Sequence, residues 1–288
     1  MVKIPKLPST SLCKSFSDQA IVIWTQLVRA HSLGILRDEE TITNDLLLTL
    51  QSAHPTEIAT FQFRKVEEKF TGADWEWWIT DGTRWVGFLV QAKILNRNSG
   101  KYTTLHHKVG AFRTPQIKLL IAEAERKRVV PIYIFYNYTW STVINCCDPG
   151  IDTRQFGCTV AHANVVQNHV GQGGAGLPTL ADISLPLRCM VCCDEGSISL
   201  PDRAARAVAR AARVSTTFNP YAPDKAGMAG PGSDIREPIF LDSPPPYVER
   251  LLKSKNTEER RRVIREVLNE VGAVRSVVVM RQSPRQSP

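Results

Sequence analysis

The sequence lacks an apolar run long enough to cross a membrane, and its longest apolar stretches, such as Val129–Tyr136, have the length of a β-strand. Its first residues, MVKIPKLPST, lack the apolar stretch of a secretory signal. We therefore expect a cytoplasmic protein that does not enter a membrane. With 288 residues, of which 43% are hydrophobic, the chain can form one large core or a core with an appended segment.

A disulfide framework of the secreted type is also missing, because the chain has seven cysteines, an odd number. Four of them form the vicinal pairs Cys146–Cys147 and Cys192–Cys193. A zinc site is suggested by Cys189, Cys192 and Cys193 together with Cys146, Cys147 and Cys158. However, a matching second Cys-x-x-Cys is absent, and the residues around Cys189 alternate as in a strand. We therefore expect reduced and mostly buried thiols.

Two further sites have weak or missing signals. The glycine-rich stretch GQGGAG at 171–176 lacks the Lys-Ser/Thr and the strand-to-helix context of a phosphate-binding loop, so we exclude that reading. A catalytic cysteine paired with His162 or His169 stays open, although no local signature supports it.

The net charge of +8 is concentrated near the C-terminus. Residues 201–288 contain 16 Lys and Arg residues against ten Asp and Glu residues. A basic balance favours polyanionic partners, because each neutralised phosphate releases condensed counterions.

Hydrophobic periodicity predicts alternating helices and strands in the first half of the chain. In chain order these are helices at 17–34 and 39–50, strands at 57–66, 74–80 and 85–93, a helix at 114–128 and a strand at 129–138. The Asp81-Gly82 turn predicts a hairpin between the second and third strands, so we expect the three strands to form a meander.

The second half gives a mixed signal. We expect a short helix within 157–167, a core strand within 185–193, an Ala/Arg helix at 203–213, a Pro/Gly-rich linker at 218–246, a charged amphipathic helix at 247–271 and a disordered RQSPRQSP tail. The helix at 247–271 can serve a partner or a dimer, or can simply pack on the core.

The ends of the predicted hairpin carry polar groups. Alternation places Asp74 and Glu76 on one face of their strand and Gln91 and Lys93 on one face of theirs. Antiparallel pairing then brings Asp74 close to Gln91 and Lys93. Burying these groups is costly unless they pair with one another or bind a metal. The pattern predicts either an ion pair that closes the hairpin or a metal site.

This pattern resembles the PD-(D/E)XK nuclease superfamily. An Asp in GAD opens the second strand, a Gln-x-Lys in VQAK ends the third, and a Glu on the preceding helix completes the set. The spacing and residues of the GAD and VQAK motifs are most similar to those of the Mrr-like restriction endonuclease branch, in which Gln replaces the usual motif Glu. Glu40 matches the helix position, with Glu39 as the register alternative. The resemblance covers residues 38–140.

The resemblance implies a fold class and a domain division. The fold is α/β, with a restriction-endonuclease-like αβββαβ core, a mixed central sheet, and a C-terminal, mostly helical and irregular extension. The nuclease domain with its N-terminal helices spans residues 1–200, and a basic, helical and Pro-rich extension spans residues 201–288.

The resemblance also implies a Mg²⁺-dependent deoxyribonuclease, with Mn²⁺ able to substitute. Asp74 is the central metal ligand, with Glu40, the Gln91 carbonyl and the Ala92 backbone carbonyl as further ligands. Lys93 orients the attacking water or stabilises charge on the phosphate. A role in restriction or anti-phage defence follows from the branch.

The sequence departs from the family pattern at two positions. Ala73 replaces the Pro that often precedes the motif Asp, and Gln91 removes one negative charge. Glu76 offsets that loss as a further metal ligand, or else forms a salt bridge with Lys93. These departures keep a second hypothesis open, in which the protein is a catalytically inactive, nucleic-acid-binding or scaffold protein of the same fold.

Residues next to the site are candidates for nucleic-acid contact. His107, Lys108 and Gln116 follow the hairpin, and Arg206 and Arg210 lie on the Ala/Arg helix. A solvated surface is the alternative for each, and the sequence favours it for all but Gln116. We expect the tryptophans of the hairpin to pack in the core. RNA stays open as a substrate, and a homodimer or a defence-system partner protein stays open as an assembly.

Overall fold

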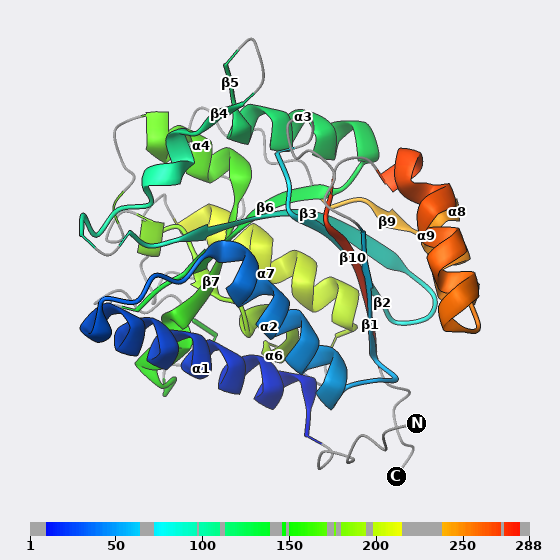
Figure 1. Cartoon of the computed structure of the whole chain (residues 1–288), viewed down its shortest axis with the longest axis horizontal. Helices are drawn as coiled ribbons and strands as arrows, with labels where there is room; N and C mark the ends of the chain where they lie inside the picture. The colour runs from blue at the N-terminus through cyan, green and yellow to red at the C-terminus, as the bar shows by residue number, and fades with distance from the viewer. Residues whose placement is uncertain are drawn as a thin grey trace.

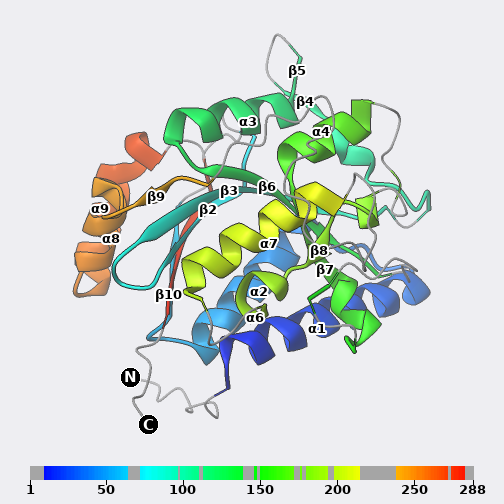
Figure 2. The same ribbon diagram turned by 180° about the vertical axis from the view of Figure 1, so that it is seen from behind.

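One mixed β-sheet lies between two layers of helices (Figures 1 and 2). This computed structural model describes residues 10–63, 72–96, 98–109, 113–138, 146–147, 150–171, 176, 180–193, 198–214, 238–271 and 274–282. The architecture confirms the predicted α/β class with a mixed central sheet.

Within the described residues the sheet has eight strands, in the order β1-β10-β2-β3-β6-β7-β8, with β9 paired to β3. They are β1 Ile58–Gln62, β2 Trp75–Thr80, β3 Trp85–Ile94, β6 Val130–Tyr136, β7 Cys158–His162, β8 Leu185–Pro186, β9 Phe240–Leu241 and β10 Ser276–Arg281. β2 and β3 are antiparallel, as the turn predicted, and β3 and β6 are parallel. A separate ribbon joins β4 Lys108–Val109 to β5 Thr114–Pro115.

The expected meander of three consecutive strands is wrong, because β10 lies between β1 and β2. It runs parallel to β2 and antiparallel to β1. Val277 and Val279 pack into one helical layer and Val278 and Met280 into the other. A strand buried on both faces needs such a continuous apolar run.

The same strand corrects the expectation of a mostly helical and irregular C-terminal extension. Residues beyond 200 supply β10, an interior strand between β1 and β2, and nearly all of the long helix α7 on the surface of the sheet. Segments 1–200 and 201–288 therefore build one sheet together.

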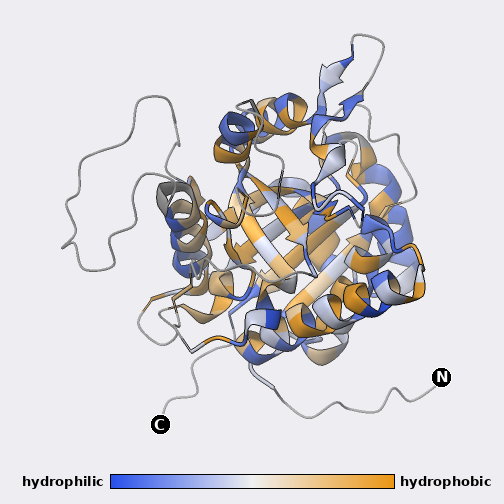
Figure 3. Ribbon diagram, turned by 90° about the vertical axis from the view of Figure 1, so that its left-hand side faces the viewer, coloured by the Kyte–Doolittle hydropathy of each residue, from blue (hydrophilic) through white to orange (hydrophobic). Residues whose placement is uncertain are grey.

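Helices cover both faces of the sheet, and Figure 3 shows hydrophobic residues concentrated between the layers. One face carries α1 Leu12–Leu33, α2 Glu39–Ala53, α6 Cys189–Cys192 and α7 Leu200–Val214. The other carries α3 Gln116–Lys127, α4 Ala163–Gly171, α8 Pro246–Lys253 and α9 Thr257–Val271. Short 3₁₀ turns lie at η2 Thr103–His106 and η3 Thr153–Gly157. In the described part of the chain, none of the helices combines the length and the apolar character needed to span a bilayer.

The predicted helices α1, α2 and α3 are confirmed, although α1 begins five residues earlier, where the side chain of Ser11 accepts a hydrogen bond from the Lys14 N–H. The strand expected at 185–193 is wrong beyond its first two residues, because α6 follows there. Residues 254–256 divide the helix expected at 247–271. The linker expected at 218–246 falls mainly on residues outside the described ones, and the RQSPRQSP tail lies almost entirely outside them.

The hairpin that carries the polar ends is packed as expected for a core element. Trp75 and Trp77 lie in the layer of α1 and α2, and Trp77 stacks on Phe16 with ring centroids 5.8 Å apart. Trp78 packs into the opposite layer. Burying each large aromatic side chain stabilises the fold by several kcal/mol, at about 25 cal/mol per Å² of apolar area. The hairpin therefore gives its polar ends a rigid support.

Candidate functional site

Asp74 lies where the chain enters β2, beside the end of β3. Its backbone N–H donates to the Val90 carbonyl across 2.8 Å. Its carboxylate atom Oδ2 accepts hydrogen bonds from the Ala92 N–H at 2.7 Å and from Gln91 Nε2 at 2.6 Å. The hairpin thus brings Asp74 and Gln91 together, as the alternation of the two strands predicts.

A glycine fixes the approach of the chain to this point. Gly72 has a φ of 66°, and a Cβ atom there would lie 2.4 Å from the Gln116 carbonyl oxygen and 2.9 Å from the Leu120 nitrogen. Only glycine tolerates both that φ and so close a contact with the first turns of α3. The contact places the start of α3 beside Asp74.

Asp74 is electrostatically perturbed. The pKa of its carboxyl is raised from 3.8 to about 7, chiefly by burial. The Ala92 N–H and Lys93 oppose this shift, and the nearby Glu39 and Glu40 carboxylates add to it. Three acidic groups thus share a partly buried region. A bound cation would relieve both their mutual repulsion and the cost of desolvation.

The amide of Gln91 is held between two partners. Its nitrogen faces Asp74 and the Ala92 carbonyl, the latter at 3.0 Å, whereas its oxygen accepts from Gln116 Nε2 at 2.8 Å. The carbonyl oxygen that the family pattern assigns to a metal therefore points to α3. The Gln116 Oε1 atom is buried and has no hydrogen-bond partner among the described residues. If both amides turned over, the hydrogen bond between them would re-form and the Gln91 oxygen would face Asp74.

Lys93 forms an ion pair with the first helical residue of α2. Its Nζ atom lies 3.6 Å from Glu39 Oε2, and the Lys93 side chain is 5% exposed. The other Glu39 oxygen, Oε1, accepts from the Ile94 N–H at 3.1 Å and from the Thr104 hydroxyl at 3.4 Å. Glu39 therefore joins α2, the end of β3 and η2.

Glu40, the residue that the sequence favoured, points to a different partner. Its Oε2 atom lies 2.9 Å from Arg275 Nη1, just before β10. Arg275 also donates its backbone N–H to the Asp74 carbonyl across 2.7 Å. The structure therefore places Glu39, the register alternative, against Lys93. Glu40 lies at the edge of this group, which we call the rim, beside Arg275.

Glu76 does not join this group, contrary to both roles expected for it. Its side chain is completely buried and forms an ion pair with Lys127 of α3. It also accepts hydrogen bonds from the indole of Trp78 at 3.1 Å and from the hydroxyl of Tyr247. Glu76 therefore ties β2 to α3 and α8 and is not a partner of Lys93.

Sequence reasoning missed Arg275 and Tyr133. The Tyr133 hydroxyl is buried without a hydrogen-bond partner in the described part of the chain. Burial raises its pKa, and the negative charges of Asp74 and Glu39 raise it further, which places the phenol near both. A Tyr in the middle of VVPIYIFYNY looks like any core residue, and Arg275 became significant only once β10 was placed in the sheet.

Of the residues expected to contact nucleic acid after the hairpin, two are exposed at the surface and one is buried. His107 and Lys108 are exposed directly after η2, the element that contacts Glu39 through Thr104. The backbone carbonyl of His107 accepts from the Gln116 N–H at the start of α3. Gln116 itself is buried, so it supports Gln91 and is not available to a polymer.

The basic face of α7 is smaller than expected. Arg206 and Arg210 are exposed, but Arg203 is buried and donates to the Val191 carbonyl. The side chain of Arg213 lies outside the described set. α7 covers the face of the sheet opposite α3.

A cavity of about 770 Å³ lies at the other end of the hairpin. Its lining includes the turn at Asp81–Thr83 together with Glu57 and Arg281. Asp74 opens β2 and this turn follows it, so the cavity does not contain the acidic group around Asp74.

Comparison with known proteins gives one result. A family described as "Family of unknown function (DUF6615)" matches residues 12–286. No curated protein matches the chain. The match spans both segments of the sheet, including β10.

Proposed function

The chain belongs to the DUF6615 family, whose function is unknown, and we propose that it is a metal-dependent nuclease that hydrolyses phosphodiester bonds in DNA. The observation that supports this proposal is the grouping of Asp74, Gln91, Lys93 and Glu39 at one end of the β2–β3 hairpin. The order of a helical Glu, a strand Asp and a Gln-x-Lys resembles the PD-(D/E)XK pattern. The proposal includes a restriction-endonuclease-like core into which β10 is inserted.

The donor atoms suit Mg²⁺, with Mn²⁺ as a substitute. Mg²⁺ prefers oxygen ligands and keeps several waters, so it needs few protein ligands. Asp74 and Glu39 offer carboxylates, and the Ala92 carbonyl and a turned Gln91 amide offer neutral oxygens. Burial is the main cause of the raised pKa of Asp74, and a bound cation would offset that cost by favouring the carboxylate. Glu40 adds negative charge at the rim.

Side chains around the proposed metal position would orient the reacting groups and stabilise developing charge. When bound, Mg²⁺ supplies Lewis-acid polarisation of the phosphate and an acidified water. Lys93 is held in place by Glu39 and donates to the water or to a phosphate oxygen on which charge develops. Gln116 fixes the Gln91 amide through one hydrogen bond. The packed tryptophans of β2 keep these groups from drifting apart.

The charge of the chain and the exposed residues beside the site support a polyanionic substrate. A net charge of +8 favours a polyanion, and the exposed His107 and Lys108 stand next to the element that contacts Glu39. We assign DNA as the substrate, and restriction or anti-phage defence in the cytoplasm as the setting. Cleavage of RNA by the same residues is the outcome that would redirect this assignment.

The direct test incubates supercoiled plasmid with the full chain and Mg²⁺ or Mn²⁺. Wild type should nick or linearise the plasmid, and Asp74→Asn and Lys93→Met should reduce the rate by at least about 100-fold. Asp81→Asn is the matched control, because it changes the same residue type at the opposite end of the hairpin and retains an Asn-Gly turn. Cleavage that survives both site substitutions would refute the assignment.

One observation favours a second function, that of an inactive nucleic-acid-binding or scaffold protein. The Gln91 amide donates to Asp74, which satisfies the carboxylate without a metal. Calorimetric titration with Mn²⁺ separates the two functions. Heat that disappears in Asp74→Asn supports the nuclease, and the absence of heat in wild type supports the inactive fold.

A further inference from the structure

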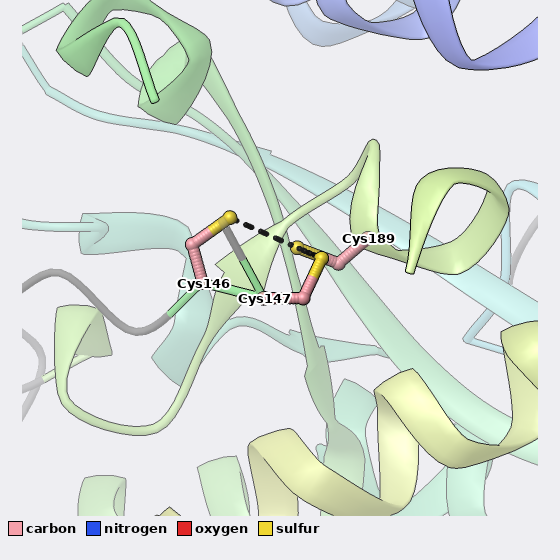
Figure 4. Close-up of side chains that lie close together, drawn as sticks. All are labelled: Cys146, Cys147 and Cys189. Atoms are coloured by element: carbon pink, nitrogen blue, oxygen red, sulfur yellow. Dashed lines mark hydrogen bonds between the residues drawn. The ribbon is translucent and has the colours of Figure 1, made fainter. Parts of the chain in front are cut away.

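Six cysteines gather where α6 meets the first turn of α1 and the segment at 146–147. The structure pairs Cys13 with Cys192 and Cys147 with Cys193 in disulfides, so the expectation of reduced thiols is wrong for four of the seven cysteines. We call Cys13, Cys146, Cys147, Cys189, Cys192 and Cys193 the cysteine cluster. Figure 4 shows Cys146, Cys147 and Cys189 directed at one another.

The sulfur atoms of this cluster have the spacing of metal ligands. Cys189 Sγ lies 3.4 Å from Cys146 Sγ and 3.9 Å from Cys147 Sγ. All three sulfur atoms lie within 4.8 Å of one another. Four thiolates at about 2.3 Å from a tetrahedral zinc ion stand about 3.8 Å apart. The two measured distances lie on either side of that value.

We propose that the reduced cluster is a structural zinc site with Cys146, Cys147, Cys189 and Cys193 as its four ligands. Cys193 is the fourth because its sulfur is bonded to that of Cys147, one of the three clustered ligands. It follows Cys189 by four residues, which is within the spacing of zinc ligands on one turn. The site would fasten the segment at 146–147 to α6, and it is independent of the nuclease proposal.

Cys13 and Cys192 form a second disulfide pair, and we do not include them among the zinc ligands. The guanidinium of Arg188 lies against both of them, with Nε 3.3 Å from Cys192 Sγ and Nη2 3.6 Å from Cys13 Sγ. The positive charge beside the cluster favours the net negative charge of a zinc ion with four thiolates. Because neither Cys13 nor Cys192 is a proposed ligand, the disulfide between them can stay intact while zinc binds.

The change from disulfide to metal site balances with a dithiol reductant. Two electrons and two protons pass from the dithiol to the Cys147–Cys193 bond, giving two protein thiols and one oxidised dithiol. Zinc binding then replaces one proton on each of the four cysteines. A disulfide oxidant reverses the sequence: it is reduced to its dithiol while the Cys147–Cys193 bond re-forms, and the ion is released.

The test uses the full chain, reduced anaerobically with dithiothreitol, loaded with Zn²⁺ and desalted. We expect about one zinc per chain by elemental analysis, and a tetrahedral thiolate spectrum when Co²⁺ replaces zinc. Cys146→Ser and Cys189→Ser should lose the ion. Cys158→Ser is the matched control, since Cys158 is a buried thiol of β7 outside the cluster, and it should bind zinc as wild type does.

Alkylation with mass spectrometry reports on the ligands without any variant. Zinc should protect Cys146, Cys147, Cys189 and Cys193 from a maleimide, and chelation should expose them. Reduced wild type that retains less than about a tenth of an equivalent of zinc would overturn the site. Protection of Cys13 and Cys192 in place of Cys147 and Cys193 would overturn the ligand set.

Discussion

Lys93 Nζ lies 3.6 Å from Glu39 Oε2, while the next residue along α2, Glu40, forms an ion pair with Arg275. Consecutive residues of an α-helix point about 100° apart, so one step in register decides which carboxylate reaches the end of β3. The two residues are chemically identical and differ only in partner, which makes them a natural matched pair.

The first prediction uses that pair. We expect Glu39→Gln to lower the rate of plasmid cleavage about 100-fold, because it removes the carboxylate next to Lys93 and a candidate metal ligand. Glu40→Gln should stay within about tenfold of wild type, since it only alters the rim charge. Single-turnover rates at saturating Mg²⁺ measure both. The reverse order of the two effects would restore Glu40 to the position that the sequence favoured.

The second prediction concerns the Gln91 amide. Gln91→Glu replaces the donor to Asp74 with a second carboxylate, although Gln116 Nε2 can still donate to it. In EDTA we expect the variant to lose about 2–3 kcal/mol of stability, the cost of a lost charged hydrogen bond and a new repulsion. Added Mg²⁺ should raise its melting temperature more than that of wild type. Equal shifts in both proteins would show that position 91 does not face the ion.

The third prediction follows from the pKa of Asp74, which burial raises to about 7. The metal-free folded chain keeps a proton that the unfolded chain loses near pH 4, so this group makes stability fall as the pH rises from about 4 to about 7. Above pH 7 its contribution is constant. Melting curves in EDTA should show this fall for wild type and not for Asp74→Asn. Conversely, Mg²⁺ affinity should increase as the pH rises toward 7, because the bound form of Asp74 is the carboxylate.

The fourth prediction concerns a histidine outside the site. Burial lowers the pKa of His162 from 6.5 to about 4, and its Nδ1 accepts from the Asn164 N–H. The unfolded chain binds a proton near pH 6.5 that the folded chain refuses, so stability is full above that pH and falls as the pH drops toward 4. The loss amounts to at most about 3 kcal/mol. His162→Gln should flatten this part of the profile measured by urea denaturation, and an unchanged profile would contradict the burial argument.

How far the sequence predicted the site is clearest at three residues. Four residues separate Thr80 from Trp85 where an Asp-Gly turn would have two, so the exact register of the hairpin was not predictable. The contact between Asp74 and Gln91 was still predictable, because a hairpin places the two strands side by side and alternation fixes the faces. The choice between Glu39 and Glu40 was not, because it depends on how α2 docks against β3. The contacts of Glu76 could not be predicted either, since its partners Lys127 and Tyr247 lie far along the chain.

The fold shows the same division between local and distant information. Helices α1 to α3 and strands β2, β3 and β6 carry their own periodicity, so they were predicted. The pairing of β10 depends on contacts between residues about 200 positions apart, for which a single sequence gives no signal. The sequence suggested a zinc site among the cysteines but gave it little support, because Cys146, Cys147 and Cys189 come together only in the folded chain.

The last prediction tests whether the sheet depends on β10. Val278 is 1% exposed between β1 and β2, so Val278→Ala should lower the free energy of unfolding by about 2 kcal/mol through the cavity it leaves. Val22→Ala is the matched control, because Val22 is 40% exposed on α1 and should change stability by less than about 0.5 kcal/mol. Urea denaturation followed by circular dichroism measures both.

Truncation gives the stronger form of the same test. Removing residues 274–288 leaves β1 and β2 without the strand that hydrogen-bonds to both, and their exposed backbone groups and apolar faces cannot pair directly without shifting the helices that cover them. We expect that truncated chain to be rapidly cleaved by trypsin and to lack a cooperative melting transition. A cooperatively folding chain of residues 1–200 would instead show that the first segment is a domain in its own right, and that β10 only docks on a sheet already formed.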